Sequence, residues 1–209
     1  MKKIPTIFER NPERLSEVVD VPNPVCQWVF DGEGHATRKY DGTCCMVYNG
    51  DVFKRREVKK GKIPPGFIEA QFDENTGKRV GWIAIDMSAP EDKYHVAAYC
   101  NQKVIPENGT YELVGPKIQG NPERFDLYEF VRHSTAPIFY DAPRTFDGLR
   151  EWLSRRDIEG IVWHHPDGRM AKIKKRDFGL ERIPGARFEE YDFVCPICQF
   201  SVRKQIEKD

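Results

Sequence analysis

Short runs of apolar or alternating residues, each ended by Gly, Pro or Asn, recur along this chain and limit the folds that it can adopt. Short runs bounded by turn-forming residues are typical of β-strands, and few segments carry helical periodicity. The clearest runs are residues 43–48, 80–86, 110–114, 127–131 and 160–163. This pattern predicts an α+β fold dominated by antiparallel strands.

Two turn sequences predict hairpins. Asn49-Gly50 follows the first apolar run, and Asn-Gly is the strongest short hairpin signal because both residues accept a positive φ. Pro166-Asp167-Gly168 is a second strong turn signal. We expect this second turn to pair residues 160–165 with residues 169–174.

Helix signals are fewer and occur at two places. The Asn-Pro pair at position 11 predicts a helix start, since Asn caps helices and Pro fits the first helical position. Residues 145–156 form the better candidate. A Thr stands at the cap position there, and Phe146, Leu149 and Leu153 fall on one face at helical spacing.

Charge and hydropathy exclude several classes of protein. The 209 residues include 33 basic and 33 acidic side chains, so any contact with nucleic acid must rest on local positive charge. Basic residues do cluster at 54–56, 59–62 and 172–176, although solvated surfaces also produce such clusters. No apolar run is long enough for a membrane span or a secretory signal. We expect a cytoplasmic or otherwise intracellular protein that is not secreted and has no membrane partner.

The six cysteines show no disulfide framework, and without a secretory signal reduced thiols are expected. Cys195 and Cys198 form a single CxxC, which is half of the ligand set that a structural zinc normally requires. No second pair of ligands is evident, so we predict less than one zinc per chain in purified protein. A zinc completed by a distant Cys or His is the alternative.

Residues 38–43, Arg-Lys-Tyr-Asp-Gly-Thr, are the most informative for chemistry. They place Lys39 at the edge of an apolar strand, and Gly42 lets a ligand or another backbone approach. A lysine becomes a nucleophile when desolvation or neighbouring cations lower the pKa of its ammonium group. Taken alone, Lys-x-Asp-Gly is more often a surface turn, so it must be judged with the segments that follow.

Four further segments follow Lys39-Tyr40-Asp41-Gly42 in order. They are Phe53-Lys54-Arg55-Arg56-Glu57, Tyr111-Glu112, Glu159-Gly160-Ile161-Val162 and Lys172-Ile173-Lys174. The series resembles motifs I, Ia, III, IV and V of the covalent nucleotidyltransferases, which comprise ATP- and NAD-dependent polynucleotide ligases and mRNA capping guanylyltransferases. Residues 127–130 stand where motif IIIa belongs, with a looser match.

Within this superfamily the chain resembles the small vertebrate-type 5′-to-3′ RNA ligases, through residues 39–45, 112–116, 121–122 and 159–164. The resemblance implies an ATP-dependent ligase for RNA repair, with RNA carrying 5′-phosphate and 3′-hydroxyl ends as its partner. The reaction would pass through a lysyl-AMP intermediate and an adenylylated 5′ end, with Mg²⁺ or Mn²⁺. We expect a monomer.

The resemblance also implies an adenylyltransferase domain over residues 1–182, with two antiparallel sheets, flanking helices and the nucleotide in the cleft between the sheets. Residues 1–38 are its N-terminal part, without an assigned role beyond packing or RNA contact. Residues 183–209 would form a short appendage. DNA ligases and capping enzymes generally add a C-terminal OB domain, and the stretch after Lys174 is too short for such a five-stranded barrel. No OB domain is therefore expected, which favours an RNA ligase.

The resemblance assigns catalysis to four residues. Lys39 attacks the α-phosphate of ATP. Lys172 and Lys174 alternate on one strand, so both point to one face, where they flank that phosphate and neutralise its charge. They would also depress the pKa of Lys39. Glu159 holds the metal ion through water or orients Lys39.

Nucleotide binding is assigned to the same three lysines and to further residues. Glu112 accepts protons from ribose hydroxyls, and Arg55 holds a ribose or phosphate oxygen. Arg55 is preferred to Arg56 because alternation puts it on the face of Phe53. An aromatic residue of motif IIIa should lie against adenine; the candidates are Phe125, Tyr128 and Phe130, and we assign Phe130.

Three other functions fit the same motifs: a DNA nick ligase, a GTP-using capping guanylyltransferase and a catalytically inactive RNA-binding module. Assays that compare RNA with DNA ends and ATP with GTP, and a test for the covalent adduct, separate them. Each motif residue taken singly can also be an ordinary strand residue. Glu112 could simply face outward, and lysines on an exposed strand edge deter aggregation.

Overall fold

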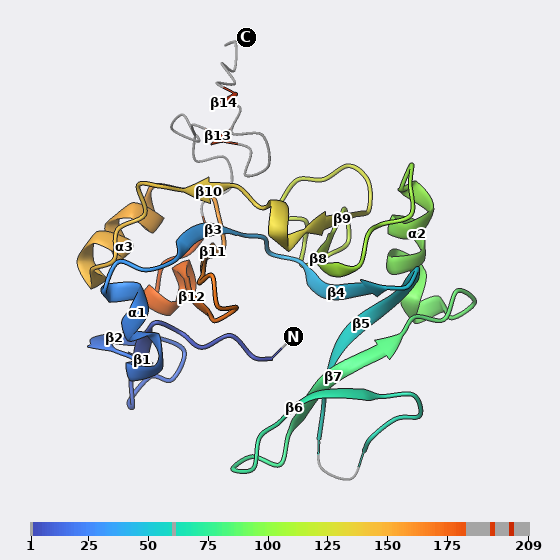
Figure 1. Cartoon of the computed structure of the whole chain (residues 1–209), viewed down its shortest axis with the longest axis horizontal. Helices are drawn as coiled ribbons and strands as arrows, with labels where there is room; N and C mark the ends of the chain where they lie inside the picture. The colour runs from blue at the N-terminus through green and yellow to red at the C-terminus, as the bar shows by residue number, and fades with distance from the viewer. Residues whose placement is uncertain (1, 60–61, 183–192, 195–200, 203–209) are drawn as a thin grey trace. The chain divides into compact units, whose positions relative to one another are not determined.

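The computed structural model describes residues 2–59, 62–182, 193–194 and 201–202 of the chain. The chain forms two compact units, each assembled from segments that are distant in sequence. Unit 1 comprises Met1–Lys3 and Asp41–Ser134, and unit 2 comprises Ile4–Tyr40 and Thr135–Asp209. Each unit has its own antiparallel sheet and its own apolar core (Figure 1). The predicted α+β fold with antiparallel sheets is confirmed.

Unit 1 is built on a six-stranded sheet in the order β6-β7-β5-β4-β8-β9. Its strands are β4 (Thr43–Tyr48), β5 (Asp51–Val58), β6 (Ile68–Phe72), β7 (Arg79–Ala84), β8 (Gly109–Val114) and β9 (Glu129–Arg132). The predicted hairpin at Asn49-Gly50 is confirmed, because it joins β4 to β5 with Tyr48 opposite Asp51. Asn49 and Gly50 have φ of 52° and 86°, the left-handed conformation that such a tight turn requires.

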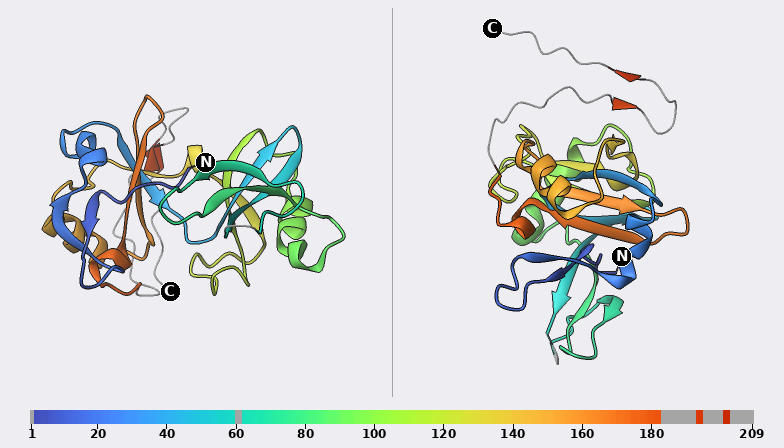
Figure 2. Two further views of the ribbon diagram at one scale, coloured as in Figure 1. Left: turned by 90° about the horizontal axis from the view of Figure 1, so that it is seen from below. Right: turned by 90° about the vertical axis from the view of Figure 1, so that its left-hand side faces the viewer.

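One face of the unit 1 sheet is covered by helix α2 (Lys93–Asn101), which follows the 3-10 turn η2 (Pro90–Asp92) (Figures 1 and 2). Ala98 of α2 belongs to an apolar cluster with Cys45, Leu113 and Phe130 of the sheet. Helix α2 was not predicted from the sequence. Its buried residues are only His95 and Ala98, so it lacks the apolar stripe by which a helix is recognised from sequence.

Unit 2 contains a four-stranded sheet in the order β10-β3-β11-β12. Its strands are β3 (His35–Lys39), β10 (Ile138–Phe139), β11 (Gly160–His164) and β12 (Met170–Lys174). The remaining elements are β1 (Phe8–Arg10), β2 (Val18–Pro22), β13 (Phe193–Val194), β14 (Ser201–Val202), α1 (Gln27–Phe30), α3 (Phe146–Ser154) and the 3-10 turns η1 (Pro24–Cys26), η3 (His133–Thr135), which begins in unit 1, and η4 (Lys175–Phe178). The predicted hairpin between β11 and β12 is confirmed, with Gly160 opposite Lys174 and His164 opposite Met170.

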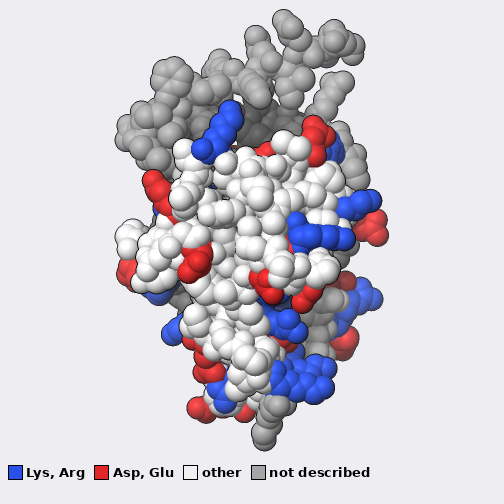
Figure 3. Space-filling view, turned by 90° about the vertical axis from the view of Figure 1, so that its right-hand side faces the viewer, with Lys and Arg blue, Asp and Glu red and all other residues white. Residues whose placement is uncertain are grey.

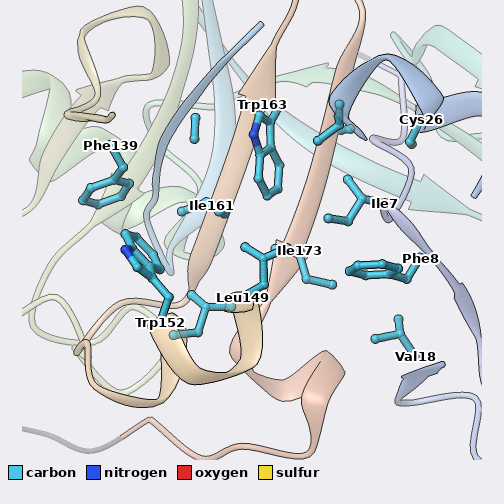
Figure 4. Packing of buried hydrophobic residues seen from close by; sticks show 14 of the residues in the cluster. Ile7, Phe8, Val18, Cys26, Phe139, Leu149, Trp152, Ile161, Trp163 and Ile173 are labelled. Atoms are coloured by element: carbon cyan, nitrogen blue, oxygen red, sulfur yellow. The ribbon is translucent and has the colours of Figure 1, made fainter. Parts of the chain in front are cut away.

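The core of unit 2 lies on one face of its sheet (Figure 4). Ile161 and Trp163 of β11 and Ile173 of β12 pack there with Leu149 and Leu153 of α3. The prediction of a helix from about residue 145 is therefore confirmed, including its buried face. Because alternate residues of a strand enter the core, the residues between them must face the opposite side of the sheet.

The helix predicted to start at Asn11 is wrong. The segment forms the loop between β1 and β2, where the backbone N–H of Asn11 donates to the carbonyl of Glu17 at 3.0 Å. The Asn11 side chain accepts from the backbone N–H of Glu13 at 2.9 Å. Asn and Pro favour turns as well as helix starts, and here their preference closes a hairpin.

Several predictions concern residues outside the described part of the chain. Cys195 and Cys198, with the predicted absence of zinc, lie there, as does most of the predicted appendage, residues 183–209. The assignment of residues 1–182 to an adenylyltransferase domain stays a prediction. Within the described ranges, no helix has the length and apolar character that crossing a membrane requires, and Cys26, Cys45 and Cys100 are free thiols.

Candidate active site

Four predicted residues lie together at one end of the unit 2 sheet, and we call them the unit 2 set. Lys39 is the last residue of β3, Glu159 precedes β11, and Lys172 and Lys174 belong to β12. Gly160 of β11 is opposite both Lys39 and Lys174, so the two lysines flank the central strand in the same row. The predicted alternation of β12 is confirmed, since Ala171 and Ile173 enter the core and both lysines face the other side.

The Glu159 carboxylate joins two of these lysines. The Lys39 Nζ donates to Glu159 Oε2 at 2.5 Å, and the Lys174 Nζ donates to Glu159 Oε1. Burial alone would raise the pKa of Glu159, but the two ammonium groups and their hydrogen bonds outweigh it, and the pKa is lowered. Glu159 is therefore held ionised between two cations.

Lys172 lies on the same face, one row further along the sheet, opposite Val162. Its pKa is lowered to about 8, first because its amine is buried and then because the Lys174 and Lys39 ammonium groups repel its charge. Asp177 and Glu159 act in the opposite direction and raise that pKa. Lys172 is thus placed to lose its proton at about pH 8.

Gly160 allows β12 to approach β11 closely at this point. A Cβ atom on Gly160 would lie 2.2 Å from the carbonyl oxygen of Ile173, closer than real Cβ contacts occur. Any larger residue would push the two strands apart, and the separation of Lys39 from Lys174 would change with it. Glycine here is consequently part of what sets the spacing of the lysines.

A second group of predicted residues lies in unit 1. It comprises Glu112 of β8, Arg55 of β5 and the Asp41-Gly42 pair of the first motif, and we call it the unit 1 set. Glu112 is buried, its Oε1 accepts from the backbone N–H of Gly42 at 3.2 Å, and its Oε2 lies 3.0 Å from His133 Nε2. The other ring nitrogen, His133 Nδ1, is 3.0 Å from Thr110 Oγ1. The carboxylate is therefore oriented by one backbone group and one imidazole. Glu112 is therefore not an ordinary outward-facing strand residue, which was the alternative considered from the sequence.

Gly42, the glycine of the first motif, lies where a larger residue would not fit. A Cβ atom there would lie 2.2 Å from the carbonyl oxygen of Leu113 and 2.8 Å from the Glu112 side chain. The predicted close approach of another backbone is thus confirmed. The preceding residue is held as well, because the Asp41 N–H donates to Glu123 Oε1 at 2.9 Å.

Arg55 lies on the same face of the unit 1 sheet as Glu112. Cys45 is opposite Lys54 and Cys44 is opposite Glu112, so alternation turns Arg55 toward the Glu112 side. The Arg55 Nε is buried without a hydrogen-bond partner in the described structure, which makes it a donor available to a bound oxygen. Arg56 is exposed, which agrees with the choice of Arg55.

Lys54, on the opposite face, pairs at 2.5 Å with buried Asp92. This ion pair links β5 to η2, and Lys54 is not on the face that carries Glu112.

Phe130 is not brought together with Glu112 and Arg55. It is opposite Leu113 in the β8–β9 register and belongs to the apolar cluster under α2. The residue opposite Glu112 is Val131, which therefore points to the Glu112 side. The assignment of Phe130 to adenine stays a prediction, and its core position gives it a packing role in unit 1.

Two contacts of the unit 1 set were missed from the sequence, those of His133 and Glu123. Neither residue belongs to a motif of the series or to an expected periodic face. Their roles arise from where the chain returns, 21 residues after Glu112 in one case and 82 residues after Asp41 in the other. No signal in a single sequence identifies such contacts.

The basic runs of the sequence do not form one continuous positive patch on the face of the molecule that Figure 3 draws. On the face drawn in Figure 3, Lys and Arg are interspersed with Asp, Glu and uncharged residues. Within the run 172–176, Lys175 is buried and its Nζ donates to the carbonyl of Arg156 at 2.7 Å. Any RNA contact by this run must therefore come from its other residues.

No group of three or more His, Cys, Asp or Glu side chains suited to a metal ion occurs among the described residues. Glu159 is a carboxylate that bonds to both Lys39 and Lys174. Mg²⁺ commonly binds through one or two carboxylates and completes its shell with water and substrate phosphates. Glu159 fits a metal held mainly by a phosphorylated ligand.

Comparisons with known proteins match this chain to RNA ligases. A family model described as RNA ligase 1 matches residues 83–188, slightly more than half of the chain. RNA ligase 1 of Rattus norvegicus is 23% identical over 222 residues, covering 69% of this chain and 67% of the relative. RNA ligase 1 of Danio rerio is 23% identical over 219 residues, covering 70% and 67%. RNA ligase 1 of Pongo abelii is 33% identical over a shorter stretch of 79 residues, covering 34% and 24%.

Proposed function

Because the chain belongs to the RNA ligase 1 family, we propose that it is an ATP-dependent RNA ligase that joins 5′-phosphate and 3′-hydroxyl ends. The family match supports the ligase activity and RNA as its substrate. The observation that carries the ATP-dependent mechanism is the gathering of Lys39, Lys172, Lys174 and Glu159 on one face of the unit 2 sheet. Two amines bonded to one carboxylate, with a third amine on the same face, suit the transfer of a phosphate-linked group.

The first proposed step loads Lys39. Its ammonium group releases a proton to water, because only the neutral amine is a nucleophile. The amine attacks the α-phosphorus of ATP; a nitrogen–phosphorus bond forms, the bond to the bridging oxygen breaks, and pyrophosphate leaves. Glu159 contributes by fixing the Lys39 side chain at 2.5 Å, so that the nitrogen is aimed before ATP arrives.

The next two steps use the same face. A 5′-phosphate oxygen attacks the phosphorus of the lysyl adenylate, which frees Lys39 and leaves AMP joined to the RNA 5′ end. The 3′-hydroxyl then attacks the 5′-phosphorus, a phosphodiester forms and AMP departs. In each step charge increases on phosphate oxygens, and the Lys172 and Lys174 ammonium groups are placed to neutralise it.

The unit 1 set fits recognition of the nucleotide. A buried carboxylate is a strong acceptor for ribose hydroxyls, and Glu112 is already oriented by Gly42 and His133. Arg55 offers its unused Nε–H to a ribose or phosphate oxygen. We propose that Glu112 and Arg55 bind the ribose and a phosphate oxygen of ATP.

Mg²⁺ or Mn²⁺ is part of this proposal. Glu159 would hold the ion, directly or through water, together with phosphate oxygens of the substrate. The ion would supply additional neutralisation of phosphate charge when bound. Lys39 and Lys174 share the same carboxylate, so the ion and the lysines would act on one group of phosphate oxygens.

The decisive experiment is incubation with ATP labelled at the α-phosphate and Mg²⁺, followed by denaturing electrophoresis. We expect a labelled protein band, no band from labelled GTP, and release of the label as AMP when RNA ends are added. A band from GTP alone would indicate a capping guanylyltransferase. Lack of any band, with RNA binding retained, would indicate an inactive RNA-binding module.

Substrate choice is tested with nicked or looped substrates that differ only in ribose or deoxyribose at the terminal nucleotides. Discrimination should depend on contacts to 2′-hydroxyl groups, most directly at the end that supplies the 3′-hydroxyl. Binding should weaken as salt rises, because each neutralised phosphate releases counterions. Equal joining of DNA and RNA ends would refute the RNA assignment and leave the ligase chemistry intact.

A further inference from the structure

The segment that opens unit 2, residues 4–10, pairs with the strand that carries Lys172 and Lys174; we call it the N-terminal strap. The backbone N–H of Lys172 donates to the carbonyl of Pro5 at 2.9 Å, and the N–H of Ile7 donates to the carbonyl of Lys172 at 3.0 Å. Thr6 and Lys172 thus form a parallel bridge. Because β12 is the outer strand of its sheet, the strap satisfies backbone groups that an edge strand would leave open.

The strap is anchored in the core of unit 2. Ile7 and Phe8 are fully or almost fully buried, and both belong to the apolar cluster of this unit (Figure 4). The Phe8 ring lies 5.1 Å from the ring of Phe146 and 6.4 Å from that of Phe178, measured between centroids. Phe178 belongs to η4, the turn that follows β12. The strap therefore contacts both the strand and the turn after it.

A buried carboxylate links the strap to the end of β12. Asp177 of η4 is 1% exposed; it accepts from the backbone N–H of Lys174 at 2.8 Å and from Arg10 Nη1 at 2.7 Å. The Arg10 guanidinium is itself fixed, because it also donates to Thr6 Oγ1 at 3.0 Å and to the carbonyl of Ser16 at 3.3 Å. An ionised group this deeply buried requires a partner, and Arg10 is the cation that supplies it.

We propose that Arg10 and Asp177 are positioning residues that place Lys172 and Lys174 for the adenylylation of Lys39. Asp177 holds the backbone of Lys174 where β12 ends, and the strap, secured by Arg10, holds the backbone of Lys172. The inference rests on the proposed function, since it concerns the same phosphate-binding lysines. It assigns a role to a segment whose sequence carries no motif.

The expected loss of rate follows from how precisely the catalytic lysines must be placed for phosphate transfer. A displacement of about 1 Å at a catalytic group can slow a reaction about 100-fold. Loss of Arg10 leaves Asp177 buried without its cation, so the turn must rearrange or admit water. Either change would move the Lys174 backbone, which Asp177 contacts directly.

The test compares Arg10→Met, Arg10→Lys and Asp177→Asn with a matched control, Arg14→Met. Arg14 belongs to the loop between β1 and β2 and pairs with Glu17 at 2.8 Å, and its side chain is 69% exposed. The measurement is the single-turnover rate of covalent adenylate formation at saturating ATP, with the melting temperature of each variant recorded. We expect Arg10→Met and Asp177→Asn to be about 10- to 100-fold slower with little change in KM for ATP. Arg10→Lys should recover part of the rate, and Arg14→Met should match the wild type.

A pH profile separates positioning from general stability. The Asp177 carboxylate raises the pKa of Lys172. In Asp177→Asn, the rate of adenylylation should therefore begin to fall at a lower pH as the pH rises. Arg10→Met leaves that carboxylate without its cation and should move the same fall to higher pH. The other charged groups around Lys172, namely Lys39, Lys174 and Glu159, are unchanged in both variants. Destabilisation alone would not shift the two profiles in opposite directions.

Two results would overturn the inference in different ways. Unchanged rates in Arg10→Met and Asp177→Asn, measured below their melting temperatures beside a normal wild-type adduct, would make the ion pair purely structural and leave the proposed function intact. Absence of any adduct in the wild-type protein would refute the proposed function, and this inference with it.

Discussion

The two sets of candidate residues differ in how their charges are arranged. In unit 2, Glu159 bonds to Lys39 of β3 and Lys174 of β12, and Lys172 of β12 lies on the same face, so the set is rich in positive charge. In unit 1, Glu112 is oriented by a backbone N–H and an imidazole, and the buried Nε of Arg55 has no hydrogen-bond partner among the described residues. The first arrangement suits neutralising phosphate charge, and the second suits accepting and donating hydrogen bonds to a ligand.

This difference predicts two kinds of mutant. Changes in the unit 2 set should lower kcat, because its interactions strengthen as charge develops on phosphate oxygens. Changes in the unit 1 set should mainly raise KM or alter the choice of nucleotide, since a ribose contact is made equally in the ground and transition states.

Removal of Lys39 should have the largest effect. Lys39→Ala has no nucleophile, and Lys39→Arg carries a guanidinium that does not lose its proton, so both should abolish the covalent adduct. The measurement is the labelled band after denaturing electrophoresis. Lys78→Ala is a suitable control, because Lys78 is an exposed lysine paired with Glu57. A full adduct in either Lys39 variant would show that the nucleophile lies elsewhere.

Glu159→Gln and Lys174→Met should slow adenylylation about 10²- to 10³-fold, the range found when one group that stabilises transition-state charge is removed. ATP binding should be largely retained, so the loss should appear in kcat. Glu151→Gln, which alters an exposed pair with Arg155, provides the control. Wild-type turnover in Glu159→Gln or Lys174→Met would remove that residue from the unit 2 set.

The pH dependence of adenylylation should report on Lys172. Its pKa of about 8 means that the ammonium form, which neutralises phosphate, predominates below pH 8 and is lost above it. We therefore expect kcat/KM, which reflects the free enzyme, to fall as pH rises through about 8. Lys172→Arg should remove this fall, because a guanidinium stays charged. A profile that is the same in Lys172→Arg and the wild type would assign the titration to another group.

The unit 1 variants should have the smallest effects on the chemical step. Glu112→Gln and Arg55→Met should raise KM for ATP about tenfold or more, since hydrogen bonds to charged groups contribute about 1.5–3 kcal/mol. Glu112→Gln should also narrow the preference for ATP over its 2′- and 3′-deoxy analogues. Arg56→Met, at the exposed neighbouring position, is the matched control. A selective loss of kcat in Glu112→Gln would contradict the division of roles between the units.

Features set by neighbouring residues could be predicted from the sequence. The Asn49-Gly50 turn, the hairpin from Gly160 to Lys174 and the shared face of Lys172 and Lys174 depend only on turn chemistry and strand alternation. The order of the motifs named the residues of both sets. The prediction from local sequence failed at Asn11. Asn favours both turns and helix N-caps, and here its side chain stabilises a turn.

Contacts between distant residues were decided only by the tertiary structure. His133 reaches Glu112, and Arg10 reaches Asp177 across 167 residues, because the sheets return the chain to those places. Phe130 faces the core since its strand pairs with Leu113 in one register, and a shift of one residue would have reversed every side chain. The sequence by itself determined which groups are available and which neighbours share a face. Strand order and register, which depend on how whole sheets bury their apolar sides, determined which of those groups meet.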